Sequence, residues 1–340
     1  MEHRSTGDAL GTMRRMARIS DAEGFIRVAA IDHPDTYLTL FDEDVSTVSF
    51  EEVVESKLEL IEAMAPHATA MLLDPVWSLG QAVIGGALPR DVGLISGLED
   101  LYYTPQTSTV GFDTELRLKP DWSPTKLAAL GCDAAKLVVF HRADGPPERS
   151  EQVHEVVRQV ARECTRLQLP LVVEPLWFPE PGESVADPEV AARRTESIIT
   201  SARSFRDAGA DVMKVEFPVS LESADGRSGA DHACARLDEA VDGPWVLLSA
   251  GVTFEGFLDQ LTVAARHGCL GFMAGRAIWG DSVGRHPADV RAAGARLAAQ
   301  RLDQLAGILA DNGSPRRAMR PSPGLVGEIG ARWYAGFGQD

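Results

Sequence analysis

Eight short apolar runs, separated by longer segments with helical periodicity, constrain the fold of this chain most strongly. The runs predict strands at residues 25–32, 69–74, 92–98, 134–140, 170–175, 211–217, 244–251 and 270–275. The segments between them predict helices at 50–65, 123–131, 149–168, 188–208, 231–241, 254–267 and 287–311. This alternation is typical of parallel α/β folds, and eight units predict a closed (β/α)8 barrel, the TIM barrel.

Local signals support these helix boundaries. Ser49 and Ser123 are predicted N-caps, and Pro124 suits the first position of a helix. Three helices are expected to end at a glycine just before the next strand, at Gly131, Gly209 and Gly268. The pattern predicts one barrel domain over 21–312, with extensions at 1–20 and 313–340.

Three polar stretches interrupt the repeat. Residues 104–122 predict a loop or a short extra hairpin. Residues 178–190 and 220–231 are rich in Pro, Gly and acidic residues and predict mobile loops at the rim.

The net charge of −17 argues against nucleic acid or an anionic membrane as a partner, because such binding needs a basic surface. No apolar run is long enough to span a membrane, and residues 1–20 lack the apolar region of a secretory signal, so we expect a cytoplasmic protein. The four cysteines form no CxxC pair and are expected to be reduced. A small anionic substrate is compatible with this net charge, because its binding needs only a local group of cations.

Lysine is rare in this chain, and two lysines lie inside predicted strands. Of 33 basic residues only five are lysine, and of these Lys136 and Lys214 interrupt apolar runs. A barrel strand has no solvated face, so a lysine there needs a partner unless it reaches a strand end. Burial and a neighbouring cation both favour a neutral amine, which can form an imine with a ketone. The two lysines therefore predict the chemistry of a class I aldolase.

Other polar residues end the predicted strands, where barrel enzymes carry their active sites. They are Asp32, Asp74, Glu174, Ser249 and Arg276. Each of the three carboxylates has a structural role as the alternative to a role in the active site. Asp32 and Asp74 could form turns, and Glu174, which precedes a proline, could mark the transition from strand to loop.

The turns after the last two predicted strands suit a phosphate group. The sequences LLSAG at 247–251 and GFMAGRAIW at 271–279 provide small residues whose backbone N–H groups can face an anion. Arg276 adds a charge-assisted contact.

Two other functions remain open. A metal-dependent barrel lyase could use His33 and His141 with Asp32, Asp74 and Glu174, although no HExxH motif or close histidine pair is present. A non-catalytic sensor of sugar phosphates could use the same pocket without turnover.

The sequence resembles the class I tagatose-1,6-bisphosphate aldolase family, whose relatives include the sulfofructose-phosphate aldolases. The resemblance extends from about residue 20 to about residue 285. Its most specific parts are CDAAKLVVF (132–140), LPLVVEPL (169–176), ADVMKVEFPV (210–219), PWVLLSAGV (244–252) and GFMAGRAIW (271–279).

The resemblance implies a role for each matching residue. Lys214 corresponds to the lysine that forms the Schiff base, Glu174 to the acid/base, Lys136 to an assisting lysine and Asp32 to the aspartate after the first strand. The C1 phosphate is expected at Ser249, Gly251, Gly275 and Arg276.

One motif departs from the family pattern. Where the family usually reads Asp-Gln-Arg after the first strand, this chain reads DHPDTYLTLF, so Asp32 remains but the arginine is missing. His33, Asp35 and Tyr37 are therefore candidate specificity residues, with turn formation as the alternative.

Taken together, the sequence predicts a metal-independent aldolase without a cofactor. It is expected to cleave a phosphorylated ketose into dihydroxyacetone phosphate and an aldehyde. A homo-oligomer is a further expectation, since such assemblies are common.

Overall fold

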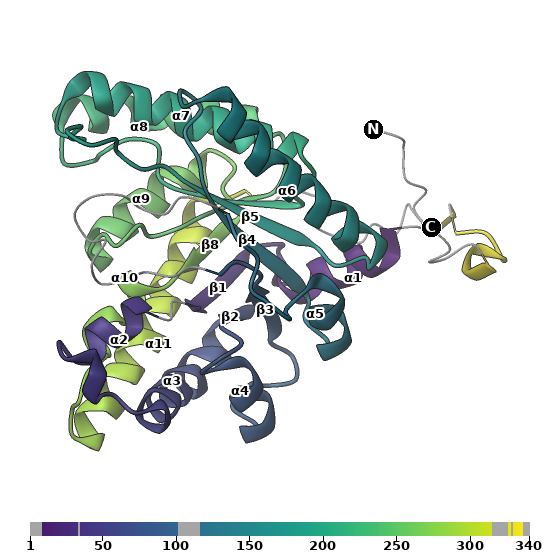
Figure 1. Ribbon diagram of the computed structural model, residues 1–340, viewed down its shortest axis with the longest axis vertical. Helices are drawn as coiled ribbons and strands as arrows, with labels where there is room; N and C mark the ends of the chain where they lie inside the picture. Colours follow the sequence, from purple (N-terminus) through teal and green to yellow (C-terminus); the bar gives the residue numbers. More distant parts are fainter. Residues whose placement is uncertain (1–8, 33–34, 101–115, 315–325, 328, 336–340) are drawn as a thin grey trace.

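The computed structural model describes residues 9–32, 35–100, 116–314, 326–327 and 329–335. Eight parallel strands close into a barrel in chain order, with β1 paired to both β2 and β8 (Figure 1). The strands are β1 Ile26–Ile31, β2 Ala70–Leu73, β3 Gly93–Gly97, β4 Ala134–Phe140, β5 Leu171–Leu176, β6 Val212–Val215, β7 Trp245–Leu247 and β8 Gly271–Ala274. The predicted TIM barrel is confirmed.

Helices surround the barrel (Figure 1). The main ones are α1 Leu10–Arg18, α2 Asp35–Phe41, α3 Phe50–Met64, α4 Leu79–Gly85, α5 Pro124–Leu130, α6 Pro147–Arg166, α7 Pro188–Asp207, α8 Ala224–Val241, α9 Phe254–Arg266, α10 Arg276–Trp279 and α11 Ala288–Asn312. Short 3₁₀ turns are at Val45–Thr47, Ala65–His67, Gly280–Ser282 and Trp333–Ala335.

The predicted caps are present. Ser49 forms a capping box with Glu52, and Ser123 accepts a hydrogen bond from the backbone N–H of Lys126. Gly131, a helix C-cap, and Gly209 have φ of 92° and 112°, a left-handed conformation that favours glycine.

Two predicted boundaries are wrong by more than two residues. Helix α8 begins at Ala224, within the stretch 220–231 that was expected to be a loop, because Ser223 caps the helix by accepting from the N–H of Gly226. Strand β7 ends at Leu247 rather than at Gly251, because Ala250 and Gly251 turn the chain with positive φ.

The extra segment after β3 lies partly outside the described residues. Of the predicted loop or hairpin at 104–122, the structure describes 116–122. Leu118 forms an antiparallel bridge with Glu99, and the N–H of Lys119 donates to the carbonyl of Leu98. This short pairing brings Lys119 to the carboxyl end of β3.

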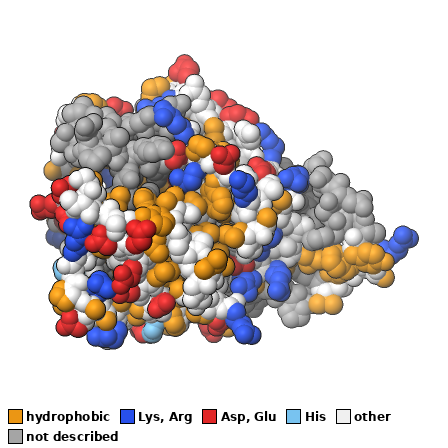
Figure 2. Space-filling view, turned by 60° about the horizontal axis from the view of Figure 1, so that its bottom comes forward, with side chains coloured by type: hydrophobic (Ala, Val, Ile, Leu, Met, Phe, Trp, Pro, Cys, Tyr) orange, Lys and Arg blue, Asp and Glu red, His pale blue; other side chains and the backbone are white. Residues whose placement is uncertain are grey.

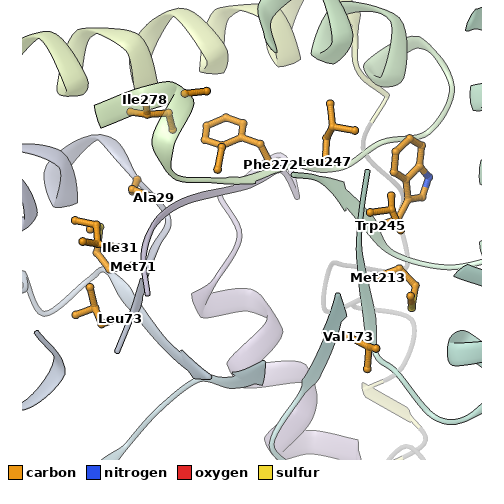
Figure 3. Packing of buried hydrophobic residues seen from close by; sticks show 14 of the residues in the cluster. Ala29, Ile31, Met71, Leu73, Val173, Met213, Trp245, Leu247, Phe272 and Ile278 are labelled. Carbon is orange, nitrogen blue, oxygen red and sulfur yellow. The ribbon is translucent and has the colours of Figure 1, made fainter. Parts of the chain in front are cut away.

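Alternate residues of each strand face two different apolar layers. One set, which includes Val28, Leu72, Val172 and Val246, fills the inside of the barrel. The other set packs against the helices, and Figure 3 labels several of its residues together with Ile278 of α10. Residues with the register of the first set therefore point to the barrel axis.

Helix α1 closes the amino end of the barrel. Met16 and Ile19 belong to the inner apolar layer, and the backbone carbonyl of Ile19 accepts from the hydroxyl of Thr69. The carboxyl ends of the strands are the opposite, working end.

The surface mixes side chains of both charges with hydrophobic ones on the face in Figure 2. No helix among the described residues is long and apolar enough to cross a membrane. The four cysteines are buried free thiols.

Candidate active site

Five charged side chains meet at the carboxyl end of the barrel, where all of them have the inward-facing register. They are Asp32 after β1, Glu99 after β3, Lys136 on β4, Glu174 on β5 and Lys214 on β6. Each side chain is at most 8% exposed. We call this set the ion-pair cluster.

Lys136 lies at the centre of the ion-pair cluster. Its Nζ is 2.8 Å from Oδ2 of Asp32, 2.7 Å from Oε1 of Glu99 and 3.1 Å from Oε2 of Glu174. Burial alone lowers the pKa of an ammonium group, but the three carboxylates outweigh it and raise the pKa of Lys136 well above its ordinary value. Lys136 is therefore a fixed cation.

Lys214 has a simpler environment. Its Nζ lies 2.9 Å from Oε2 of Glu174, and this is its one ion pair among the residues that the structure describes. Lys136 and Lys214 are thus close together, as expected, because both pair with the carboxylate of Glu174. Of the two, Lys214 is the one left with a single charged neighbour.

Glu174 remains ionised between the two lysines. Burial raises the pKa of this carboxyl group, yet Lys136 and Lys214 more than compensate and hold the pKa below its usual range. A carboxylate in this position can accept a proton from the Lys214 ammonium group, whereas Lys136 keeps its proton.

Glu99 is a site residue that the sequence reasoning missed. Its second oxygen accepts from the N–H of Val138 at 3.2 Å, so the carboxylate bridges β4 and the end of β3. A side chain at Gly97 would come within 2.8 Å of this carboxylate, so glycine makes room for it. The available signal was its position just after a strand, as for Asp32 and Asp74.

The turns after β7 and β8 meet at Arg276. The turn at Ser249 is closed by the N–H of Val252 donating to the Ser249 carbonyl, and Gly251 has φ of 77°. A Cβ at Gly251 would lie 3.5 Å from Nη2 of Arg276, so this guanidinium group sits against the turn. Arg276 is exposed, and no carboxylate among the described residues pairs with it. Gly275 precedes it as the N-cap of α10.

Asp74 is tied to a lysine outside the barrel. Its Oδ2 lies 2.6 Å from Nζ of Lys57 on α3, and its Oδ1 accepts from the N–H groups of Val76 and Trp77. The predicted turn-forming role of Asp74 is thus present, while Lys57, a fully buried cation, was missed. The sequence indicates the burial of Lys57 only through its position on the apolar face of α3, with Val53 and Leu60.

Tyr37 does not support the specificity role expected for it. The side chain is fully buried, and its hydroxyl forms a 2.7 Å hydrogen bond with Ser56. The ring packs on Trp279 and lies 4.9 Å from Nζ of Lys57. Tyr37 is therefore a core residue. Of the other two candidates, His33 and the side chain of Asp35 lie outside the described part of the chain.

His141 also points away from the strand ends. It follows β4 on the helix-facing side, where its ring nitrogens lie 2.7 Å from the Ser201 hydroxyl and 2.8 Å from the Ser150 hydroxyl. Burial and the neighbouring His154 lower the pKa of His141 to about 4. This position does not support the alternative in which His141 ligates a metal with Asp32, Asp74 and Glu174. The described residues hold no group of three or more metal-ligating side chains.

Comparisons with known proteins agree with this arrangement. The family model described as DeoC/LacD family aldolase matches residues 29–281. Tagatose 1,6-diphosphate aldolase 1 of Streptococcus mutans is 28% identical over 287 residues, which are 79% of this chain and 85% of that protein.

Solved structures with a similar fold include two aldolases. A Schiff base-forming fructose-1,6-bisphosphate aldolase is 18% identical with a TM-score of 0.57, over 88% of this chain and 99% of that one. The fructose-bisphosphate aldolase from Slackia heliotrinireducens is 16% identical with a TM-score of 0.58, over 91% of this chain and 94% of that one.

Proposed function

We propose that this chain, which belongs to the DeoC/LacD family of aldolases and is a carbon–carbon lyase, cleaves a phosphorylated ketose through an imine on Lys214. The observation that carries the proposal is the unequal environment of two buried lysines. Lys136 is surrounded by three carboxylates, whereas Lys214 has an ion pair with Glu174 alone among the described residues. Only Lys214 can therefore become the free amine by a single proton transfer.

The first steps use the Lys214–Glu174 pair. Glu174 accepts a proton from the Lys214 ammonium group across 2.9 Å, and the free amine attacks C2 of the ketose. The carbinolamine then loses water, with protonated Glu174 giving its proton to the departing hydroxyl. The product is a protonated imine on Lys214.

Cleavage follows with the imine as the electron sink. Glu174, again a carboxylate, accepts the proton of the C4 hydroxyl, and the C3–C4 bond breaks. Its electron pair moves toward the imine nitrogen, giving an enamine, and the aldehyde departs. Protonation at C3 and hydrolysis then release dihydroxyacetone phosphate and regenerate Lys214.

Lys136 and Asp32 are assigned supporting roles in this scheme. The permanent positive charge of Lys136 stabilises the developing negative charge on substrate hydroxyls, as preorganised charges do. Asp32 holds the Lys136 ammonium group at 2.8 Å and so keeps it in place.

The phosphate of the ketose is assigned to the β7–β8 side. Ser249, Gly251 and Gly275 offer backbone and hydroxyl donors, and the exposed Arg276 guanidinium group offers charge. Relatives support this choice of substrate class, since the similar Streptococcus mutans protein bears the name of a tagatose 1,6-diphosphate aldolase.

Borohydride reduction in the presence of dihydroxyacetone phosphate tests the proposal. The expected result is a covalent adduct on the peptide that contains Lys214, absent from Lys214→Met. An adduct on Lys136, or full activity of Lys214→Met, contradicts it. Activity lost to a chelator and restored by a divalent cation, with Lys214→Arg active, would instead favour the metal-dependent lyase.

A further inference from the structure

A cavity lies beside the ion-pair cluster, at the carboxyl ends of β1, β2 and β3. It has a volume of about 40 Å³ and is lined by Asp32, Asp74, Pro75, Val76, Gly97, Glu99 and Lys119. We call it the β1–β3 cavity. Asp32 and Glu99 belong to both the cavity and the ion-pair cluster, so the cavity adjoins the side chains around Lys214.

The polar wall of the β1–β3 cavity is acidic. Three of its described side chains are carboxylates, and the ammonium groups of their partners Lys136 and Lys57 are buried, with side chains 3% and 0% exposed. The ion pairs around the cavity and the cluster join five carboxylates (Asp32, Asp74, Glu99, Asp100, Glu174) to four lysines (Lys57, Lys119, Lys136, Lys214). This set offers no spare positive charge to a second anionic group.

Lys119 is the one cation among the described lining residues of the cavity, and it already has a partner. Its side chain is 26% exposed, and Nζ lies 3.2 Å from Oδ1 of Asp100. The backbone pairing between Lys119 and Leu98 keeps the two chain segments together. Asp100 therefore neutralises Lys119 at the place where an anion would have to bind.

The sequence adds no other cation on this side. There is no Lys or Arg in residues 28–56, 58–89 or 91–116, which include the whole chain between β1 and α3 and between β2 and α4. Arg117 is exposed and does not line the cavity. The opposite, β7–β8 side has Arg276, so the mouth of the barrel is electrostatically asymmetric.

We propose that the β1–β3 cavity takes an uncharged, hydroxylated aldehyde half, so that the substrate is a ketose 1-phosphate rather than a ketose bisphosphate. Carboxylates accept hydrogen bonds from hydroxyl groups, whereas a phosphate beside them meets like charge. This inference rests on the proposed function, since it assumes that the ketose is bound through Lys214 and Arg276.

The test compares kcat/KM for fructose 1-phosphate and tagatose 1-phosphate with that for the matching 1,6-bisphosphates. We expect the monophosphate to be favoured by about tenfold or more, since like charges oppose the bisphosphate. An equal or higher value for both bisphosphates overturns the inference.

Variants of the Lys119–Asp100 pair sharpen this test. Asp100→Asn frees Lys119 and should raise the bisphosphate-to-monophosphate ratio of kcat/KM by about fivefold. The double variant Asp100→Asn/Lys119→Met should lose that gain, while Lys126→Met, an exposed lysine outside the cavity, should leave the ratio unchanged. A ratio that does not respond to Asp100→Asn contradicts the assignment of this cavity.

Failure of the two proposals can be told apart. Borohydride trapping uses dihydroxyacetone phosphate, which lacks the aldehyde half, so trapping on Lys214 together with a bisphosphate preference overturns only this inference. If the protein prefers the bisphosphate and Arg149→Met removes that preference, the far half of the substrate binds in another cavity. That cavity lies beside β4 and is lined by His141, Arg142 and Arg149. Absence of trapping overturns the proposed function itself.

Discussion

Nζ of Lys214 lies 2.9 Å from Oε2 of Glu174, and this buried contact joins the amine expected to form the imine to the base that can accept its proton. The contact explains why the ionised state of Glu174 matters. Because the pKa of Glu174 is lowered, the residue starts the proposed reaction as a base.

Glu174→Gln should remove proton transfer and leave the phosphate contacts in place. General acid–base catalysis typically contributes about 10²- to 10⁴-fold, so we expect kcat to fall by about that factor. Steady-state cleavage assays measure the fall, and intact far-UV circular dichroism serves as the folding control. A kcat within threefold of the parent, about 0.7 kcal/mol, would show that another group moves the proton.

Lys136→Met should destabilise the barrel as well as slow the reaction. The substitution leaves Asp32, Glu99 and Glu174 buried without their shared cation, and breaking such a pair typically costs about 3–5 kcal/mol. Urea unfolding at pH 7 measures the loss. The matched double variant Lys136→Met/Glu99→Gln should recover part of it, whereas a double variant as unstable as the single one would argue against the charge explanation.

The barrel was predictable because its strands are buried on both faces. Most strand residues are apolar, so a charged residue inside such a run, as at Lys136 and Lys214, is conspicuous. Glycines and serines at the helix ends gave most boundaries. The predicted start of helix α8 is too late in the chain because the first turns of the helix are polar and rich in small residues. Only the Ser223 cap marks the true start.

The partners of the lysines could not be predicted from the sequence. Glu99 and Lys136 are 37 residues apart, and Lys57 and Asp74 are 17 apart, so their contacts depend on barrel register and on how α3 packs. The same reason explains Tyr37. Its position soon after Asp32 suggested the mouth of the barrel, but α2 turns its side chain into the core.

His141 should make stability depend on pH. Its folded-state pKa of about 4 lies below the ordinary 6.5, so the unfolded chain binds the proton more readily. Stability is therefore complete above pH 6.5 and falls as the pH drops from 6.5 to 4, by about 2–4 kcal/mol from this group.

Urea unfolding from pH 7 to pH 4.5 checks the prediction for His141. His141→Gln should show a flatter profile over this range, while His232→Gln, an exposed histidine, should follow the parent. Equal slopes for His141→Gln and the parent would mean that His141 does not control the acid sensitivity.

Arg276→Met should weaken binding of the ketose phosphate. A hydrogen bond to a charged group contributes about 1.5–3 kcal/mol, so KM is expected to rise by about 10- to 100-fold with a smaller change in kcat. Steady-state kinetics with a ketose 1-phosphate measure both constants. Arg266→Met, an exposed arginine in the last turn of α9, is the control, and an unchanged KM for Arg276→Met would place the phosphate elsewhere.

Lys57→Met should destabilise the protein although Lys57 lies outside the ion-pair cluster. Its Nζ bonds Asp74 at 2.6 Å and the Ile31 carbonyl at 3.1 Å, so its loss leaves a buried carboxylate and an unsatisfied backbone oxygen. We expect a cost of about 3–5 kcal/mol in urea unfolding. In the double variant Lys57→Met/Asp74→Asn, the amide oxygen can still accept from Val76 and Trp77 without a buried charge, so its cost should be smaller. A coupling energy near zero between the two substitutions would show that the ion pair does not contribute, because residues in contact normally couple by about 0.5–3 kcal/mol.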